Sequence, residues 1–141
     1  MLKGAGDAED CGNLIKNVWY NAIYKEKDDE TDKYTRPDGY FVSDFNDALG
    51  NLFVDSSFSS KIDSIDKNQD TVNSLMKKLK NPPEEYKDAY DALSDFYDAY
   101  LALTGCATDP SGSLQTYSST FNDADTDTLN AYKAMQQYLG D

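Results

Sequence analysis

Residues 88–106, DAYDALSDFYDAYLALTGC, decide the fold, because acidic and large apolar side chains separate here with the period of a helix. The aspartates recur every three or four residues, at Asp88, Asp91, Asp95 and Asp98. A second face, which begins just before this stretch, carries Tyr86, Tyr90, Leu93, Tyr97, Tyr100 and Leu101. This arrangement is typical of an amphipathic helix with one solvated face.

The end of the same stretch, LALTGC at 101–106, has the residues of a lipobox, where bacteria attach lipid to a cysteine. A lipobox works only behind a basic segment and an apolar segment near the N-terminus. Here an acidic amphipathic helix precedes it instead. We therefore predict that Cys106 is not lipidated and that Gly105 ends the helix as its C-cap.

Helical periodicity recurs through most of the chain, whereas residues 27–39 lack it and no stretch alternates as a strand would. We predict helices over 5–27, 41–54, 57–80, 82–104 and 113–139. Short connections between such helices favour an antiparallel bundle. The prediction is an all-α fold over 1–141, a single domain of four long helices plus one shorter helix at about 41–54.

The formal net charge of −13 is unevenly distributed, with −4 over residues 1–80 and −9 over residues 81–141. Such a chain lacks the basic surface that nucleic acids and anionic membranes require. No apolar run approaches the length of a membrane span, so we expect no membrane insertion by this segment. A monomer with no nucleic acid partner is the expectation, and a basic protein or a small ligand remains compatible with the charge.

The chain has no histidine, which removes Ser-His-Asp triads, Cys-His dyads and the common zinc sites. DADTD at 123–127 resembles the start of a calcium loop, but the glycine and glutamate that an EF-hand needs are missing. No phosphate-binding glycine loop occurs. We predict no catalytic residue, no cofactor and no metal site, and hence a protein that is not an enzyme.

The two cysteines, Cys11 and Cys106, allow one disulfide. If all five helices alternate in direction, both cysteines lie at the same end of the bundle and a bridge is geometrically feasible. If 41–54 is not a separate pass, they lie at opposite ends, beyond disulfide reach. Two buried free thiols in a cytosolic protein are the alternative. We favour the disulfide, and with it a location outside the cytoplasm.

The helix over 82–104 also offers the main candidate for a partner surface. Its acidic row is Glu84, Asp88, Asp91, Asp95 and Asp98, its tyrosines are Tyr86, Tyr90, Tyr97 and Tyr100, and Asp123 and Asp127 could lie beside the row. A solvated helix face explains the acids most simply, and packing at the bundle boundary explains most of the eleven tyrosines. The functional alternative is a surface for a basic protein or a small ligand.

Four stretches together resemble the mature region of uncharacterised lipoproteins and surface proteins of Gram-positive bacteria. They are DETDKYT (29–35), FVSDFNDAL (41–49), LKNPPEEYKDAYDAL (79–93) and SGSLQTYSSTFNDAD (111–125). The resemblance covers nearly the whole chain and implies a cell-envelope location, with any signal peptide and lipid anchor upstream of Met1. It implies no reaction and no catalytic residue.

Two hypotheses of function follow. The first is a non-enzymatic, extracytoplasmic binding or interaction module of a bacterial cell-envelope protein. The second is a cytosolic acidic inhibitor, of the immunity-protein type, that shields a basic protein partner. An oxidised cysteine pair favours the first hypothesis and free thiols favour the second.

Overall fold

The computed structural model describes residues 1–139, and over these residues the fold is all α, as predicted; residues 140–141 of the predicted domain lie outside this part. The elements are α1 (Leu2–Tyr24), α2 (Asp32–Thr35), α3 (Phe45–Val54), α4 (Ser56–Lys78), the 3-10 helix η1 (Glu84–Tyr86), α5 (Lys87–Thr108) and α6 (Leu114–Gln136). Four long helices and a shorter α3 confirm the predicted set, and α2 and η1 add single turns.

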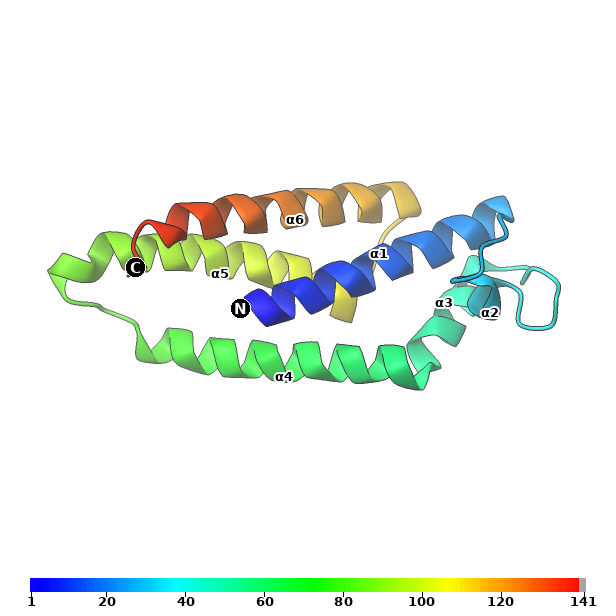
Figure 1. The fold of residues 1–141 in the computed structure, drawn as a ribbon, viewed down its shortest axis with the longest axis horizontal. Helices are drawn as coiled ribbons and strands as arrows, with labels where there is room; N and C mark the ends of the chain where they lie inside the picture. Colours follow the sequence, from blue (N-terminus) through cyan, green and yellow to red (C-terminus); the bar gives the residue numbers. More distant parts are fainter. Residues whose placement is uncertain (140–141) are drawn as a thin grey trace.

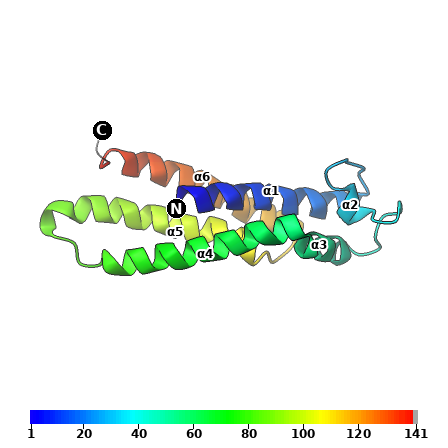
Figure 2. The ribbon, with the colours of Figure 1, turned by 60° about the horizontal axis from the view of Figure 1, so that its bottom comes forward.

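The four long helices lie side by side along one axis, with α1 and α5 running one way and α4 and α6 the other (Figures 1 and 2). The short helices α2 and α3 gather where α1 ends and α4 begins. The N-terminus lies part of the way along the bundle, so α4, α5 and α6 extend past the start of α1 (Figure 1). We call this three-helix part the open end and the part with α2 and α3 the closed end.

The predicted five-pass alternation is wrong, because α3 does not cross the bundle. Asp55 is the only residue between α3 and α4, and its backbone is extended. Its side chain accepts a hydrogen bond from the Phe58 N–H at 3.0 Å. A carboxylate at this N-cap position satisfies a free amide at the start of α4. The chain therefore bends at Asp55, and α4 makes the return pass.

Several predicted helix ends need correction. The helix α1 spans Leu2–Tyr24 rather than 5–27, α3 begins at Phe45 rather than 41, and α6 ends at Gln136 rather than 139. The helix predicted to begin at residue 82 is divided into η1, from Glu84, and α5, from Lys87. It begins later than predicted because Asn81 adopts a left-handed φ of 59° and Pro83 is extended. At the other end α5 continues through Gly105 to Thr108, so Gly105 is not a C-cap. Cys106 and Ala107 are both buried there, and packing of these side chains extends the helix past the glycine.

Small residues on one face of α1 bring the other long helices close. Gly4, Ala8 and Gly12 are all buried at spacings of four residues. A Cβ on Gly4 would overlap the Asn68 side chain of α4, and a Cβ on Gly12 would overlap the Phe121 ring of α6. The three positions therefore let α1 occupy the centre of the four-helix part of the bundle.

The predicted disulfide is wrong in this structure, because Cys11 and Cys106 are both buried free thiols. The five-pass arrangement that supported the pairing does not exist. Each thiol instead packs in the core as a small apolar group. Burial raises the pKa of Cys11 to about 11 and also raises the pKa of Cys106, so both remain protonated at neutral pH.

Candidate functional site

The tyrosines of the predicted partner surface do not form one exposed face. Tyr86 is exposed, Tyr90 and Tyr97 are half-buried, and Tyr100 is fully buried. Tyr97 donates a hydrogen bond to Asn73 Oδ1 at 2.5 Å, and the Tyr100 hydroxyl bonds in the same way to Asn68. These two tyrosines tie α5 to α4. Sequence spacing placed them on the correct side of the helix but could not separate packing from exposure.

The acidic row of α5 is exposed, and part of it lies beside α6. A shallow hollow of about 390 Å³ between α5 and α6 is lined by Asp95, Asp98, Ala99, Ala102, Asp127, Asn130 and Ala131. Asp127 therefore lies beside the row, whereas Asp123 does not line the hollow. We call this the acidic hollow. Three carboxylates around a floor of alanines give it a concentrated negative charge.

The N-terminal part of the row lies apart from that hollow. Glu84 belongs to η1, and Asp88 and Asp91 follow in the first turns of α5. Asp91 already forms an ion pair with Lys87, 3.3 Å between Oδ2 and Nζ. The predicted five-acid surface is thus divided between the end of the bundle and its α5/α6 flank.

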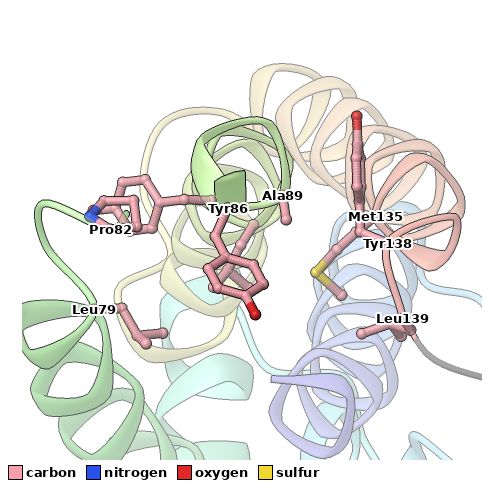
Figure 3. Close-up of a pocket in the computed structure, with 9 residues that line it drawn as sticks. Leu79, Pro82, Tyr86, Ala89, Met135, Tyr138 and Leu139 are labelled. Carbon is pink, nitrogen blue, oxygen red and sulfur yellow. The ribbon is translucent and has the colours of Figure 1, made fainter. Parts of the chain in front are cut away.

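An apolar hollow at the open end is the site that the sequence analysis missed. It encloses about 280 Å³ and is lined by Leu79, Pro82, Tyr86, Ala89, Tyr90, Leu93, Met135, Tyr138 and Leu139. Figure 3 shows Leu79 at the end of α4, Tyr86 of η1, Ala89 of α5 and the residues at the end of α6 around one space. We call it the apolar hollow. Ligand pockets in proteins are typically concave and mostly apolar.

The ends of α4, α5 and α6 form the apolar hollow. The apolar stripe of α4 continues to Leu79 and that of α6 to Met135 and Leu139, beyond the part of the bundle where α1 lies (Figure 1). Leu79 remains 48% exposed and Leu139 55% exposed. Apolar side chains that continue at helical spacing to the ends of α4 and α6 are the sequence signal for this site.

A second hollow, of about 410 Å³, lies on the α4/α5 flank and shares Tyr90 with the apolar hollow. Its lining consists of Asn73, Met76, Lys77, Lys80, Tyr90, Ser94, Tyr97 and Asp98. We call it the lysine hollow. Its charged groups are two lysines and one aspartate, in a chain whose formal net charge is −13.

Two carboxyl groups meet across α1 and α6. A hydrogen bond with Asp125, together with partial burial and the Asp125 and Asp10 charges, raises the pKa of Glu9 to about 7. Glu9 and Asp125 line a hollow of about 200 Å³ with apolar residues of α1, α5 and α6. The pair can hold one proton near neutral pH. Among residues 1–139, no group of three side chains suited to hold a metal ion occurs.

No protein family model matches this chain, and neither the characterised proteins nor the solved structures compared with it gave a match. None of the helices within residues 1–139 is long and apolar enough to cross a membrane. The geometry of the hollows and the chemistry of their side chains are therefore the features of this chain that bear on its function.

Proposed function

We propose that this chain is a non-enzymatic binding domain of a bacterial cell-envelope protein, and that it binds through the apolar hollow at the open end. The observation that carries the proposal is this hollow. Nine side chains from the ends of α4 and α6, the connection after α4, η1 and the start of α5 surround a space without a charged residue. Burial of exposed apolar surface is the main driving force for association in water. The open end supplies such surface in a concave form.

The composition of the hollow supports binding rather than catalysis. Leucine, methionine and proline supply apolar contact, and Tyr86, Tyr90 and Tyr138 add flat rings that carry a hydroxyl. Tyrosine offers a large contact area at a low cost in conformational entropy. The lining of the hollow contains no carboxylate, no lysine or arginine and no thiol.

An uncharged apolar dye tests this proposal directly. N-phenylnaphthylamine should gain fluorescence on titration with the protein, because it moves from water into the hollow. Ala89→Trp should remove the gain by filling the hollow, whereas Ala134→Trp, on the exposed side of α6, should retain it. Circular dichroism would establish that both variants fold. Equal dye binding by both variants would contradict the assignment to this hollow.

The cell-envelope location is supported by the resemblance of four sequence stretches to lipoproteins and surface proteins of Gram-positive bacteria. A disulfide no longer supports it, because Cys11 and Cys106 are free thiols. Protease treatment of intact host cells, followed by detection with an antibody to this chain, tests the location. Degradation before lysis supports the envelope. Protection until lysis would favour the cytosolic alternative.

The acidic hollow supports the second candidate, a cytosolic acidic inhibitor of a basic protein. Negative charge is concentrated on one flank by Asp95, Asp98 and Asp127. Complementary charge raises the association rate of two proteins and fixes their relative orientation. A nona-lysine peptide tests it by calorimetry. Asp95→Asn with Asp127→Asn should weaken binding, whereas Asp63→Asn with Asp70→Asn on α4 should not. Equal weakening by both pairs would indicate non-specific attraction to net charge.

A further inference from the structure

We propose that the apolar hollow and the lysine hollow together bind a single-chain fatty carboxylate, with its alkyl chain in the apolar hollow and its carboxylate at Lys77 and Lys80. This inference rests on the proposed function and specifies its ligand. Tyr90 lines both hollows, so they adjoin on one side of α5.

The apolar hollow fits an alkyl chain rather than a polar ligand. It has no charged lining residue, and Leu79, Leu93, Met135 and Leu139 provide aliphatic surface from three helices. Methionine adapts its shape to irregular apolar ligands because its side chain is unbranched and flexible. Hydrophobic transfer contributes about 0.8 kcal/mol for each buried methylene, so a chain that fills this space gains affinity with length.

The lysine hollow supplies the opposite charge to a carboxylate. Lys77 and Lys80 are exposed, and neither takes part in an ion pair among those found in residues 1–139. Asp98 is the one acid in the same lining and leaves a surplus of positive charge. By contrast, three other hollows of this surface have acidic side chains and no basic ones. An anionic head group is therefore attracted by the positive charge of the lysine hollow on the α4/α5 flank.

Lining residues of both hollows lie where the chain passes from α4 to α5. Lys80 lies between Leu79 and Pro82 in the sequence, and both of these neighbours line the apolar hollow. The positively charged Lys80 is thus next in sequence to a residue that lines the apolar hollow. Such an arrangement fits a ligand with an apolar body and one anionic end, and it disfavours a cationic amphiphile of equal length.

The three methionines allow the test to follow each part of the ligand. In protein labelled with ¹³C at the methionine methyl groups, Met135 reports on the apolar hollow and Met76 on the lysine hollow. Met1 lines neither hollow and serves as an internal reference. Dodecanoate at pH 8, below its micelle concentration, should shift Met135 and Met76 saturably and leave Met1 unchanged. Dodecyltrimethylammonium and dodecyl maltoside provide the same chain with a cationic and an uncharged head.

Charge reversal at the lysines tests the head group. Lys77→Glu combined with Lys80→Glu should weaken dodecanoate binding about tenfold or more, and should leave the maltoside unaffected. Lys78→Glu is the matched control, since Lys78 lies between them in sequence but lines neither hollow. It should change the affinity less than twofold.

The outcomes separate this inference from the proposed function. Equal or tighter binding of the cationic amphiphile at Met135, or no effect of the double reversal, would overturn the fatty carboxylate and leave the apolar site in place. If no amphiphile shifts Met135 and the uncharged dye also fails to bind, both proposals fall. Preference for dodecanoate that the double reversal abolishes supports the inference.

Discussion

The two ends of this bundle differ in what covers their apolar side chains. At the closed end, Trp19 stacks on Phe45 with ring centroids 5.4 Å apart and contacts Tyr117 at 5.5 Å. Asn21 there donates a hydrogen bond to Thr31 Oγ1 at 2.9 Å, which ties α1 to the α2 region. At the open end, Tyr86 and Leu139 are 58% and 55% exposed.

The difference teaches that one set of apolar stripes can serve two purposes. Where α1, α2 and α3 cover the stripes, the side chains stabilise the fold. At the open end, the same kinds of side chain remain in contact with water. Exposed apolar surface that is concave marks a binding site more often than an accident of packing.

The largest effect is expected at the closed end. Trp19→Ala should lower the free energy of unfolding by about 3–5 kcal/mol, because a buried ring and its two aromatic contacts are lost. Leu79→Ala at the open end should cost less than about 1 kcal/mol, because half of this side chain is already exposed. Urea denaturation followed by circular dichroism measures both. Equal losses would contradict the contrast between the ends.

Gly12→Val should have the next largest effect, a loss of about 1–3 kcal/mol or more. The new side chain would overlap the Phe121 ring and force α1 and α6 apart. Gly6→Ala on the same helix meets no neighbouring atom and should stabilise the protein by up to about 1 kcal/mol, through helix propensity. A shift of the two melting temperatures in the same direction would argue against the close approach at Gly12.

Tyr117→Phe should cost about 1 kcal/mol. The Tyr117 hydroxyl donates a hydrogen bond to the backbone carbonyl of Cys106 at 2.7 Å in a buried setting, and its removal leaves this carbonyl without that partner. Burial also raises the pKa of Tyr117, with a smaller contribution from the neighbouring Cys106 and Cys11 thiols. Denaturation of this variant beside Tyr86→Phe, whose ring is exposed, isolates the buried hydrogen bond.

The smallest effect is expected for the pH dependence of stability that Glu9 causes. This residue lies between the open end and the closed end. Its pKa is about 7 in the folded protein and 4.5 ordinarily, so folding favours the protonated form. The resulting stability is fully present below pH 4.5 and is lost as the pH rises through 7. Glu9→Gln should therefore flatten the decline of the melting temperature between pH 5 and pH 8.

Glu26→Gln, in the exposed segment after α1, is the control for that pH series. It should decline with pH as the unmodified protein does. Histidine does not contribute to this range, because the chain contains none. If the melting temperatures of Glu9→Gln and of the unmodified protein fall in parallel with pH, the Glu9–Asp125 carboxyl pair is not the cause of the decline.

Much of the fold followed from periodicity, because burial of one face imposes spacings of three and four on each helix. The class and the four long helices were predicted in this way. The bend at Asp55 and the left-handed Asn81 were not, since each depends on one residue's backbone rather than on a pattern. Errors at these two points determined the wrong number of passes and the wrong start of α5.

The candidate sites were less predictable than the fold. Helical spacing placed Asp95 and Asp98 on one face of α5, but it offered both Asp123 and Asp127 as neighbours of that row, and only Asp127 lines the acidic hollow. The apolar hollow depends on how the ends of α4, α5 and α6 meet, and the periodicity of a single helix does not predict that arrangement. The prediction for Cys11 and Cys106 was also wrong. It relied on a five-pass bundle, whereas both are buried free thiols that lie near Tyr117 although α3 is not a pass.

The Gly4, Ala8 and Gly12 stripe has a consequence for the ancestry of this domain. Leucine, isoleucine and valine replace one another readily in a core of conserved volume, whereas a position without room for a side chain allows few substitutions. Descendants of a common ancestor should therefore diverge in their large apolar residues while they retain three small residues, four apart, in the first helix. This triplet, followed by three long amphipathic helices, is a pattern by which distant relatives can be recognised.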